Sequence, residues 1–177
     1  MRAQIRNEIE QIKPFDALER MHRLDALAWV DSGVELCRRD KPATPPKHLV
    51  SYVVIADDGH ILLVDHKNAQ LWLPPGGRVE PQEHPRTTVE RELKEELGLT
   101  ASHPISDPLF VTVTETIGHT AGHMDISLWY AVTARRGQLF EFDRDEFESV
   151  CWFAFDDVPP DRADPHLLRF LRKFTSQ

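Results

Sequence analysis

Apolar residues recur at helical spacing near the start of the chain, in two successive stripes. The first stripe is Ile5, Ile9 and Ile12, and the second is Leu18, Met21, Leu24, Leu27 and Ala28. Asp16 suits the N-cap of the second helix, and Gly33 suits its end. Residues 41–46 (Lys-Pro-Ala-Thr-Pro-Pro) cannot stay helical, because a residue before proline is driven into extended conformations. We therefore predict an N-terminal helical extension with a proline-rich linker over residues 1–46, and a main domain over residues 47–177.

The rest of the chain carries strand-like runs. Residues 48–56 are apolar and β-branched, and a turn at 57–59 separates them from a second run at 60–66, which predicts a β-hairpin. The two prolines of residues 74–75 are expected to halt any strand ladder before the two glycines that follow let the backbone turn. Further strands are expected at 110–116, 126–133 and 149–155, and an amphipathic helix is marked by Leu167, Phe170, Leu171 and Phe174. This order of elements predicts a mixed sheet between helices.

A central helix is predicted over residues 85–97, because Pro85 suits the first turn and Gly98 suits the left-handed residue after the end. Its apolar stripe is Val89, Leu93 and Leu97, and a narrow neighbouring face carries Glu92, Glu95 and Glu96. Like charges at this spacing repel by roughly a few tenths of a kcal/mol per pair, so these glutamates need open solvent or a cation. A hard divalent ion with oxygen ligands is the natural partner, and an ordinary solvated face is the alternative.

A longer spacing decides between these two interpretations. Gly77 is followed after five residues by Glu83, and after seven more by Arg-Glu-Leu-Lys-Glu-Glu-Leu-Gly-Leu at residues 91–99. The probability that this spacing matches by chance is on the order of 10⁻⁹ per starting position. The spacing resembles the Nudix box of the Nudix hydrolase (MutT-like) family, and the resemblance extends over most of residues 48–174. It implies a Nudix-type α/β/α sandwich with a mixed sheet, of the α/β (α+β) class, preceded here by the helical extension.

The resemblance also implies roles for individual residues. Glu83 would complete the acidic cluster, and Arg91 would orient a carboxylate by a charge-assisted hydrogen bond. The ligands of Mg²⁺ or Mn²⁺ would be Gly76, through its backbone carbonyl, Glu92, Glu95 and Glu96. Glu92 is our first choice for the general base, since it lies within the metal cluster.

Further candidates lie outside the box. Glu115, Asp125 and Glu146 could supply a general base or contact the substrate, and each is otherwise an ordinary surface carboxylate. Trp72 and Phe110 lie near the expected edges of the site and are offered as substrate contacts, although aromatic residues in strands more often belong to the core.

Two groups of residues could bind metal or react through sulfur. His119, His123 and Asp125 could ligate a transition metal. We favour the alternative, a glycine-flanked loop whose histidines face solvent or touch substrate. Cys37 and Cys151 lie far apart without metal-ligand spacing, and we expect them to be buried free thiols.

Composition excludes several classes of protein. The 177 residues are 41% hydrophobic and 28% charged, with a net charge of −8. No Lys/Arg-rich run is present, which argues against binding a nucleic-acid duplex, and an acidic protein that handles phosphates needs a metal. No apolar run approaches the length of a membrane span, and the N-terminus lacks the apolar segment of a signal peptide. We predict a cytoplasmic protein with no membrane partner.

The resemblance implies hydrolysis of a pyrophosphate bond in a nucleoside diphosphate linked to another moiety, by divalent-metal-assisted attack of water. The first alternative is a catalytically silent Nudix-like module that binds a nucleotide and regulates a partner. The intact set of box residues argues against it. The second is an isopentenyl-diphosphate isomerase, whose catalytic cysteine context neither Cys37 nor Cys151 matches. The nucleotide or linked moiety is left open, because no signature outside the box matches a branch of the family.

The N-terminal extension is predicted to form a homodimer. Its two apolar stripes are larger than one short antiparallel helix pair would bury internally, and twofold contact is the commonest way for soluble chains to cover such a surface. The alternative is packing within the same chain, over the sheet or beside the C-terminal helix.

Overall fold

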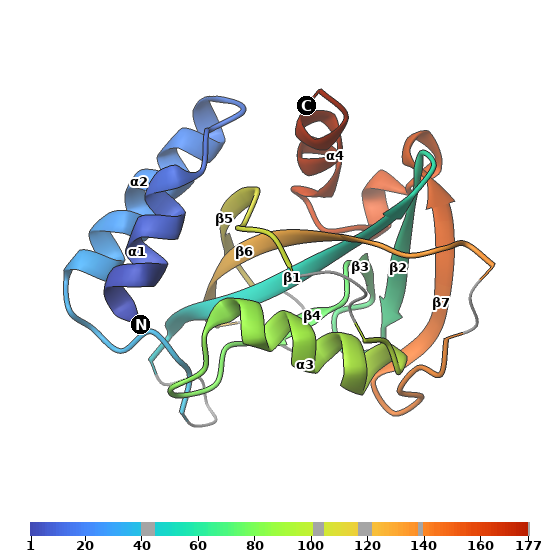
Figure 1. The fold of residues 1–177 in the computed structure, drawn as a ribbon, viewed down its shortest axis with the longest axis horizontal. Helices are drawn as coiled ribbons and strands as arrows, with labels where there is room; N and C mark the ends of the chain where they lie inside the picture. The colour runs from blue at the N-terminus through green and yellow to red at the C-terminus, as the bar shows by residue number, and fades with distance from the viewer. Residues whose placement is uncertain (40–44, 101–104, 117–121, 138–139, 177) are drawn as a thin grey trace.

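A mixed β-sheet lies at the centre of the protein, which is represented by a computed structural model (Figure 1). The structure describes residues 1–39, 45–100, 105–116, 122–137 and 140–176. The strands are β1 (Lys47–Asp57), β2 (His60–His66), β3 (Leu71–Leu73), β4 (Gly76–Arg78), β5 (Phe110–Glu115), β6 (Met124–Thr133) and β7 (Phe147–Ala154). The helices are α1 (Arg2–Gln11), α2 (Ala17–Asp31), α3 (Pro85–Leu97) and α4 (Leu167–Thr175), with short 3₁₀ turns at Phe155–Asp157 and Pro160–Arg162.

The strand order is β3-β2-β1-β6-β5, with β4 paired to β1 and β7 paired to β2. Strands β1 and β6 run parallel, and the other strand pairs run antiparallel, so the predicted mixed sheet is confirmed. The predicted hairpin is formed by β1 and β2.

The sequence argument missed β3 and β4. The two prolines at 74–75 interrupt the strands but do not halt pairing, because a proline carbonyl can still accept a hydrogen bond. The carbonyl of Pro75 accepts from the Val53 N–H at 2.8 Å, and β4 then continues antiparallel to β1.

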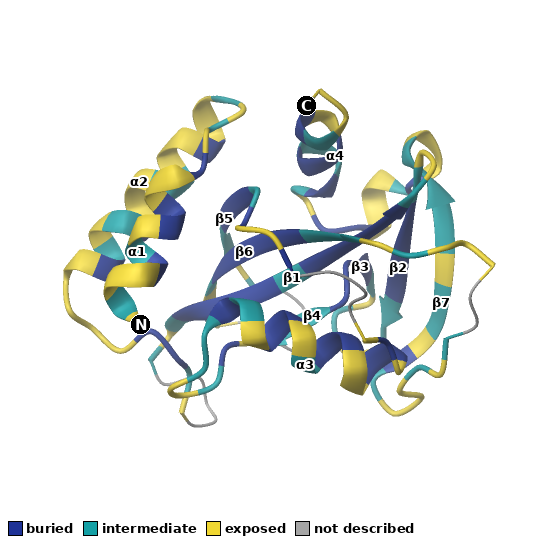
Figure 2. Ribbon diagram, in the orientation of Figure 1, coloured by how far each residue is buried: buried dark blue, intermediate teal, exposed yellow. Residues whose placement is uncertain are grey.

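Alternate side chains of the sheet enter two apolar clusters, one on each face. One cluster joins the sheet to α3 and includes Leu49, Val53, Val89, Leu93 and Leu97. The other joins the sheet to α4 and includes Val54, Phe110, Trp129 and Phe170. Figure 2 shows this buried material along the strands and on the inner sides of the helices. The predicted sandwich is therefore confirmed, with α3 and α4 on opposite faces (Figure 1).

Helices α1 and α2 pack beside the sheet, where α2 contacts the edge strand β5. Asp16 is the N-cap of α2 as predicted, since its carboxylate accepts from the Glu19 N–H at 2.8 Å. Two ion pairs join this helix to α4, Asp16 with Arg169 at 2.6 Å and Glu19 with Lys173 at 2.7 Å. These contacts attach the extension to the same body as the sheet.

The first apolar stripe of the extension, Ile5, Ile9 and Ile12, is buried in the same cluster as the sheet and α3. These three residues are covered within their own chain and need no second subunit. Residues Leu18, Met21 and Leu24 of the second stripe are 39%, 64% and 57% exposed. The homodimer stays a prediction, and it now depends on that exposed stripe.

The two cysteines differ from each other. Both are free thiols, and Cys37 is buried as expected. Cys151 is exposed on β7 and belongs to neither apolar cluster, so the expectation of burial is wrong for it. Among the described residues, no helix combines the length and apolar character needed to cross a membrane.

Candidate active site

Helix α3 presents the acidic residues of the site. Pro85 occupies its first position, and the Nδ1 of His84 accepts from the Arg86 N–H at 3.2 Å, which caps the start. Gly98 ends the helix in the left-handed conformation, at φ 64°. The helix bounds predicted from Pro85 and Gly98 are confirmed.

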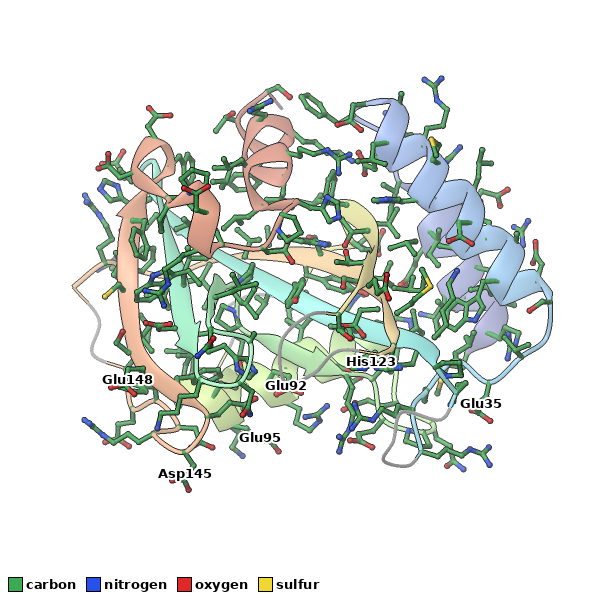
Figure 3. All side chains as sticks on the ribbon, turned by 180° about the vertical axis from the view of Figure 1, so that it is seen from behind. Glu35, Glu92, Glu95, His123, Asp145 and Glu148 are labelled. Atoms are coloured by element: carbon green, nitrogen blue, oxygen red, sulfur yellow. The ribbon has the colours of Figure 1, made fainter. Side chains whose placement is uncertain are left out.

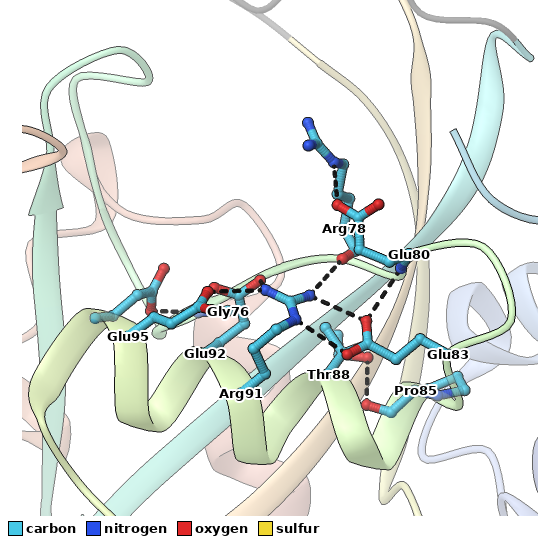
Figure 4. Close-up of polar contacts among 11 residues, drawn as sticks. Gly76, Arg78, Glu80, Glu83, Pro85, Thr88, Arg91, Glu92 and Glu95 are labelled. Atoms are coloured by element: carbon cyan, nitrogen blue, oxygen red, sulfur yellow. Dashed lines mark hydrogen bonds and ion pairs between the residues drawn. The ribbon is translucent and has the colours of Figure 1, made fainter. Parts of the chain in front are cut away.

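Arg91 is the centre of a hydrogen-bond network with three glutamates (Figure 4). Its Nε and Nη2 each donate to one oxygen of Glu83 at 3.0 Å, which makes a two-pronged charge-assisted pair. Its Nη1 donates to Glu92 at 2.7 Å and to Glu95 at 3.1 Å. Burial alone would raise the pKa of Glu83, but the hydrogen bonds from Arg91, the Glu80 N–H and Thr88 together outweigh it, and the pKa is lowered.

Glu92 and Glu96 are buried, with 9% and 3% of their surface exposed, and they lie one turn apart on α3. Burial raises the pKa of both carboxyl groups, that of Glu96 well above its usual range, and the neighbouring charge of Glu92 raises the pKa of Glu96 further. The backbone N–H of Gly76 donates to Glu96 at 2.9 Å. Glu95, the third acid of the face, is exposed.

Glycine is required where β4 passes α3. A Cβ on Gly77 would lie 2.1 Å from the Oε1 of Glu92, and a Cβ on Gly76 would lie 2.1 Å from the carbonyl oxygen of Ser51. Gly76 also has φ 149°, which L-residues rarely adopt. The absence of side chains here lets the backbone of β4 lie close to the buried carboxylates, and the Gly76 N–H reaches Glu96.

The box residues form one wall of a cavity of about 460 Å³, and the strands form the opposite wall. The box wall includes Gly76, Gly77, Arg91, Glu92 and Glu96. The strand wall includes residues of three strands. They are His48, Val50 and Tyr52 of β1, Thr114 and Glu115 of β5, and Asp125 and Ser127 of β6, together with His123 directly before β6. Glu92 and His123, one from each wall, are labelled in Figure 3.

The strand wall carries a compact group of two histidines and one aspartate. Parallel pairing places His48 of β1 beside Asp125 of β6, and His123 lies two residues before Asp125. The Nε2 atoms of His48 and His123 lie 3.3 Å and 3.4 Å from the Oδ1 of Asp125. Burial lowers the pKa of His48 to about 4 and raises that of Asp125 to about 7.

The predicted residues outside the box are placed in two different environments. Glu115, Asp125 and Glu146 all line the cavity. Trp72 and Phe110 are not among its lining residues, so their proposed role as substrate contacts is withdrawn.

Both aromatic residues belong to the core beneath α4. Trp72 packs edge-on against Phe153 with ring centroids 4.9 Å apart, and Phe110 packs against Trp129 and Phe170. Their side chains are directed by strand alternation into this cluster, where the hydrophobic effect holds them.

Sequence analysis missed several residues of the strand wall. His48 and Tyr52 alternate with core residues along β1, and that period-two pattern was the available signal. Asp164, which lies before α4 and also lines the cavity, gave no such signal; burial raises its pKa to about 6. His119, one member of the predicted histidine group, lies outside the described residues.

The box wall fits a hard divalent cation. Its acidic side chains offer carboxylate oxygens, and two of these groups are buried together with raised pKa values. Burying like charges side by side is costly unless a cation compensates them. Carboxylates at the rim of an open cavity therefore suit Mg²⁺ or Mn²⁺ bound together with a phosphate ligand.

The fold is a mixed sheet between helices, and its site is an acidic helix at the edge of a cavity. The family model described as "NUDIX domain" matches residues 46–174. The chain therefore belongs to the Nudix family, and the resemblance inferred from its box is confirmed. Pyrophosphate-bond hydrolysis is the general activity of this family's hydrolases.

Known relatives agree with this assignment. A MutT-like protein of Streptomyces ambofaciens is 28% identical over 130 residues, which cover 72% of this chain and 78% of that protein. A CTP pyrophosphohydrolase of Escherichia coli (strain K12) is 45% identical over 53 residues, covering 28% of this chain and 39% of the relative. The crystal structure of a MutT NUDIX hydrolase from Burkholderia pseudomallei superimposes with a TM-score of 0.59 and 26% identity, over 72% of this chain and 97% of that one.

Proposed function

We propose that this protein is a metal-dependent pyrophosphohydrolase acting on a nucleoside diphosphate linked to another moiety. The observation that carries the proposal is the network in which Arg91 binds Glu83, Glu92 and Glu95, because Arg91 and Glu92 of this network line an open cavity together with Glu96. A structural role alone would not need acidic groups buried beside one another at the mouth of a cavity.

The proposed Mg²⁺ or Mn²⁺ ligands are Glu92, Glu95, Glu96 and the backbone carbonyl of Gly76. Such an ion, when bound, neutralises charge on the phosphoryl oxygens and lowers the pKa of a bound water. The hydrogen bond from the Gly76 N–H to Glu96 supports this arrangement, because it fixes the direction of one ligand side chain.

Glu92 is the proposed general base. The water oxygen forms a bond to phosphorus, the bridging P–O bond of the anhydride breaks, and the water proton passes to the base. Burial raises the pKa of Glu92, which makes its carboxylate a better proton acceptor near neutral pH. Arg91 positions Glu92 and would limit its movement during the transfer. Asp125, Glu115 and Glu146 are the other cavity carboxylates that could take the proton.

A small nucleotide-linked molecule is the proposed substrate class. The cavity combines the acidic wall with an apolar part formed by Val64, Leu71 and Leu73, which suits a nucleobase or another flat group. Relatives support the class, since one is a CTP pyrophosphohydrolase and a structural neighbour is the NUDIX domain of Shewanella oneidensis NrtR complexed with ADP ribose. Neither a nucleic-acid duplex nor a membrane is part of the proposal.

A substrate screen tests the proposal. Nucleoside triphosphates, nucleotide sugars and dinucleoside polyphosphates are incubated with the full-length protein and Mg²⁺ or Mn²⁺, and phosphate is measured with and without a coupled phosphatase. We expect metal-dependent turnover of at least one class, lost in Glu96→Gln. Tight nucleotide binding without any turnover would instead support the silent regulatory module.

The homodimer is proposed on narrower grounds than the sequence suggested. Leu18, Met21 and Leu24 form an exposed apolar stripe on α2, and a second copy would cover it. Light scattering on the wild type and on a Met21→Glu, Leu24→Glu double variant tests this. A wild-type dimer that becomes a folded monomer in the variant supports the proposal, and a monomeric wild type rejects it.

We also propose that the protein works in the cytoplasm. The free thiols Cys37 and Cys151 support a reducing compartment, because exposed cysteines are readily oxidised elsewhere.

A further inference from the structure

The strand wall of the cavity contains a buried carboxylate oxygen that the hydrogen-bond network leaves unexplained. The Oδ1 of Asp125 accepts no hydrogen bond from any described residue, although two imidazole nitrogens lie within 3.4 Å of it. A buried carboxylate oxygen without a partner is costly. Something other than a hydrogen bond is needed to account for the convergence of His48, His123 and Asp125.

We propose that His48, His123 and Asp125 bind one transition-metal dication, with Zn²⁺ as the favoured ion, at a site separate from the box. The proposal is independent of the hydrolytic function argued above. One potential ligand atom from each of the three residues lies within 4.8 Å of the other two.

The distances suit tetrahedral coordination. Zinc binds imidazole nitrogen and carboxylate oxygen at about 2.0–2.2 Å, so neighbouring ligand atoms of a tetrahedral site are about 3.3 Å apart. The two separations from the Oδ1 of Asp125 are 3.3 Å and 3.4 Å. The imidazole rings of His48 and His123 are stacked, with centroids 4.8 Å apart and an interplanar angle of 25°, so both rings approach the aspartate from the same side.

The chemistry of the donors separates this site from the box. The box offers only oxygen ligands, which suit Mg²⁺ or Mn²⁺, whereas imidazole selects zinc and similar transition metals. Neutral imidazole is the form that binds a metal, and burial favours that form, since only 2% of the His48 side chain and 10% of the His123 side chain are exposed. An ion would also favour the charged form of Asp125.

The surroundings fix the ligands in place. The pairing of β1 with β6 sets His48 beside Asp125, and rigid strands position ligands more closely than loops do. The Oγ1 of Thr116 lies 3.2 Å from the Nδ1 of His123, which leaves the Nε2 of that ring directed at Asp125. Metal-binding histidines are commonly oriented by such a contact to their other nitrogen.

Three protein ligands leave one tetrahedral position for a ligand that is not part of the chain. All three residues line the same cavity as Glu92 and Glu96, so that position would open toward the space where a substrate binds. Three-ligand zinc sites with an open position bind water or an anionic oxygen there. The strand wall would thus hold an anion-binding metal opposite the magnesium site of the box.

Metal binding to the full-length protein tests the proposal. The protein is stripped with a chelator and titrated with Zn²⁺ against a chromophoric chelator, and separately with Co²⁺, in the presence of excess Mg²⁺. We expect one tightly bound Zn²⁺ per chain and the visible absorption bands of tetrahedral Co²⁺. His123→Ala and Asp125→Asn should each weaken Zn²⁺ binding by at least about 100-fold and remove the cobalt bands.

Two controls make the result specific. His60→Ala removes a histidine at the turn between β1 and β2, outside the cavity lining, and should leave Zn²⁺ binding unchanged. Glu96→Gln should also bind Zn²⁺ normally while losing the proposed hydrolysis, which separates the failure of one proposal from the failure of the other.

Asp125→Asn preserves shape, so it keeps the test valid if the more buried His48→Ala does not fold. Wild-type protein that binds no Zn²⁺ under excess Mg²⁺ would overturn the proposal. Unchanged affinity in folded His123→Ala and Asp125→Asn variants would also overturn it.

Discussion

The two walls of the cavity are built in different ways. The box wall comes from one continuous segment, where β4 and α3 follow each other in the chain, and its side chains are joined by the Arg91 network. The strand wall draws His48 from β1 and Asp125 from β6, which are far apart in sequence and meet only through strand pairing. The first wall is a local structure, and the second is a product of sheet register.

The difference extends to chemistry. Carboxylates and an arginine on one side suit a hard cation and a polyphosphate, because charge is concentrated there and compensated in pairs. The other side keeps its imidazoles neutral by burial, with the pKa of His48 lowered to about 4, so it offers lone pairs rather than charge. A ligand that spans the cavity would meet two distinct sets of donors.

Replacing the candidate general bases one at a time gives the largest expected difference between the walls. At saturating metal, Glu92→Gln should lower kcat by about 10²- to 10⁴-fold with a small change in KM, and the acid limb of the pH–rate profile should move or disappear. Asp125→Asn and Glu146→Gln should change kcat far less. If excess Mn²⁺ rescues Glu92→Gln while Asp125→Asn stays inactive, the base lies on the strand wall.

A glycine substitution breaks the box wall without removing any of its side chains. Gly77→Ala places a methyl group 2.1 Å from the Oε1 of Glu92 and must displace that carboxylate. Activity should fall by about 10²-fold, since a displacement of about 1 Å can cost that much. Gly137→Ala is the matched control, because nothing lies within 4 Å of its added Cβ. Equal activity of the two variants would show that Glu92 does not need its observed position.

Because one wall is local in sequence and the other depends on strand pairing, the sequence predicted the two walls to different extents. The spacing of Gly77, Glu83 and residues 91–99 was enough to identify the box, because that wall comes from one continuous segment of β4 and α3. The Arg91 network and the burial of Glu96 add detail but do not change the prediction. The helix bounds were predictable for the same reason, from Pro85 and Gly98.

The strand wall could not be predicted from spacing. His48 lies more than seventy residues before Asp125, and only the parallel register of β1 and β6 joins them. Trp72 and Phe110 were misplaced for a related reason, since strand alternation decides which face an aromatic side chain enters and the sequence alone did not fix it. The short strands β3 and β4 were missed because two prolines separate them.

Removing the charge of Asp16, which is not part of either wall, should give the smallest effect. We expect it to change stability and not catalysis. The hydrogen bond from Arg169 lowers the pKa of Asp16 to about 2. A folded-state pKa below the unfolded one adds stability above about pH 4, and this stability is lost as the pH falls toward 2. Asp16→Asn should cost about 1 kcal/mol at pH 6, after discounting for solvent screening of this partly exposed pair, and nothing near pH 2.

Asparagine also caps helices well, so the variant tests the charge rather than the N-cap. Unfolding in urea at both pH values measures the difference, and hydrolysis at pH 6 should be unchanged. An equal loss of stability at pH 6 and pH 2 would assign the effect to capping alone.

The most direct test of the proposed hydrolysis is a Mg²⁺ titration of turnover in the wild type and in Glu96→Gln, using a substrate found by the nucleotide screen. Removing one ligand charge leaves the shape of the site intact, so the variant should lose about 10²-fold or more in rate at low Mg²⁺ and recover in part at high Mg²⁺. Its melting temperature without metal should not fall, because one of two buried like charges is removed. Full activity of Glu96→Gln at low Mg²⁺ would contradict the assignment of the box as the metal-binding catalytic wall.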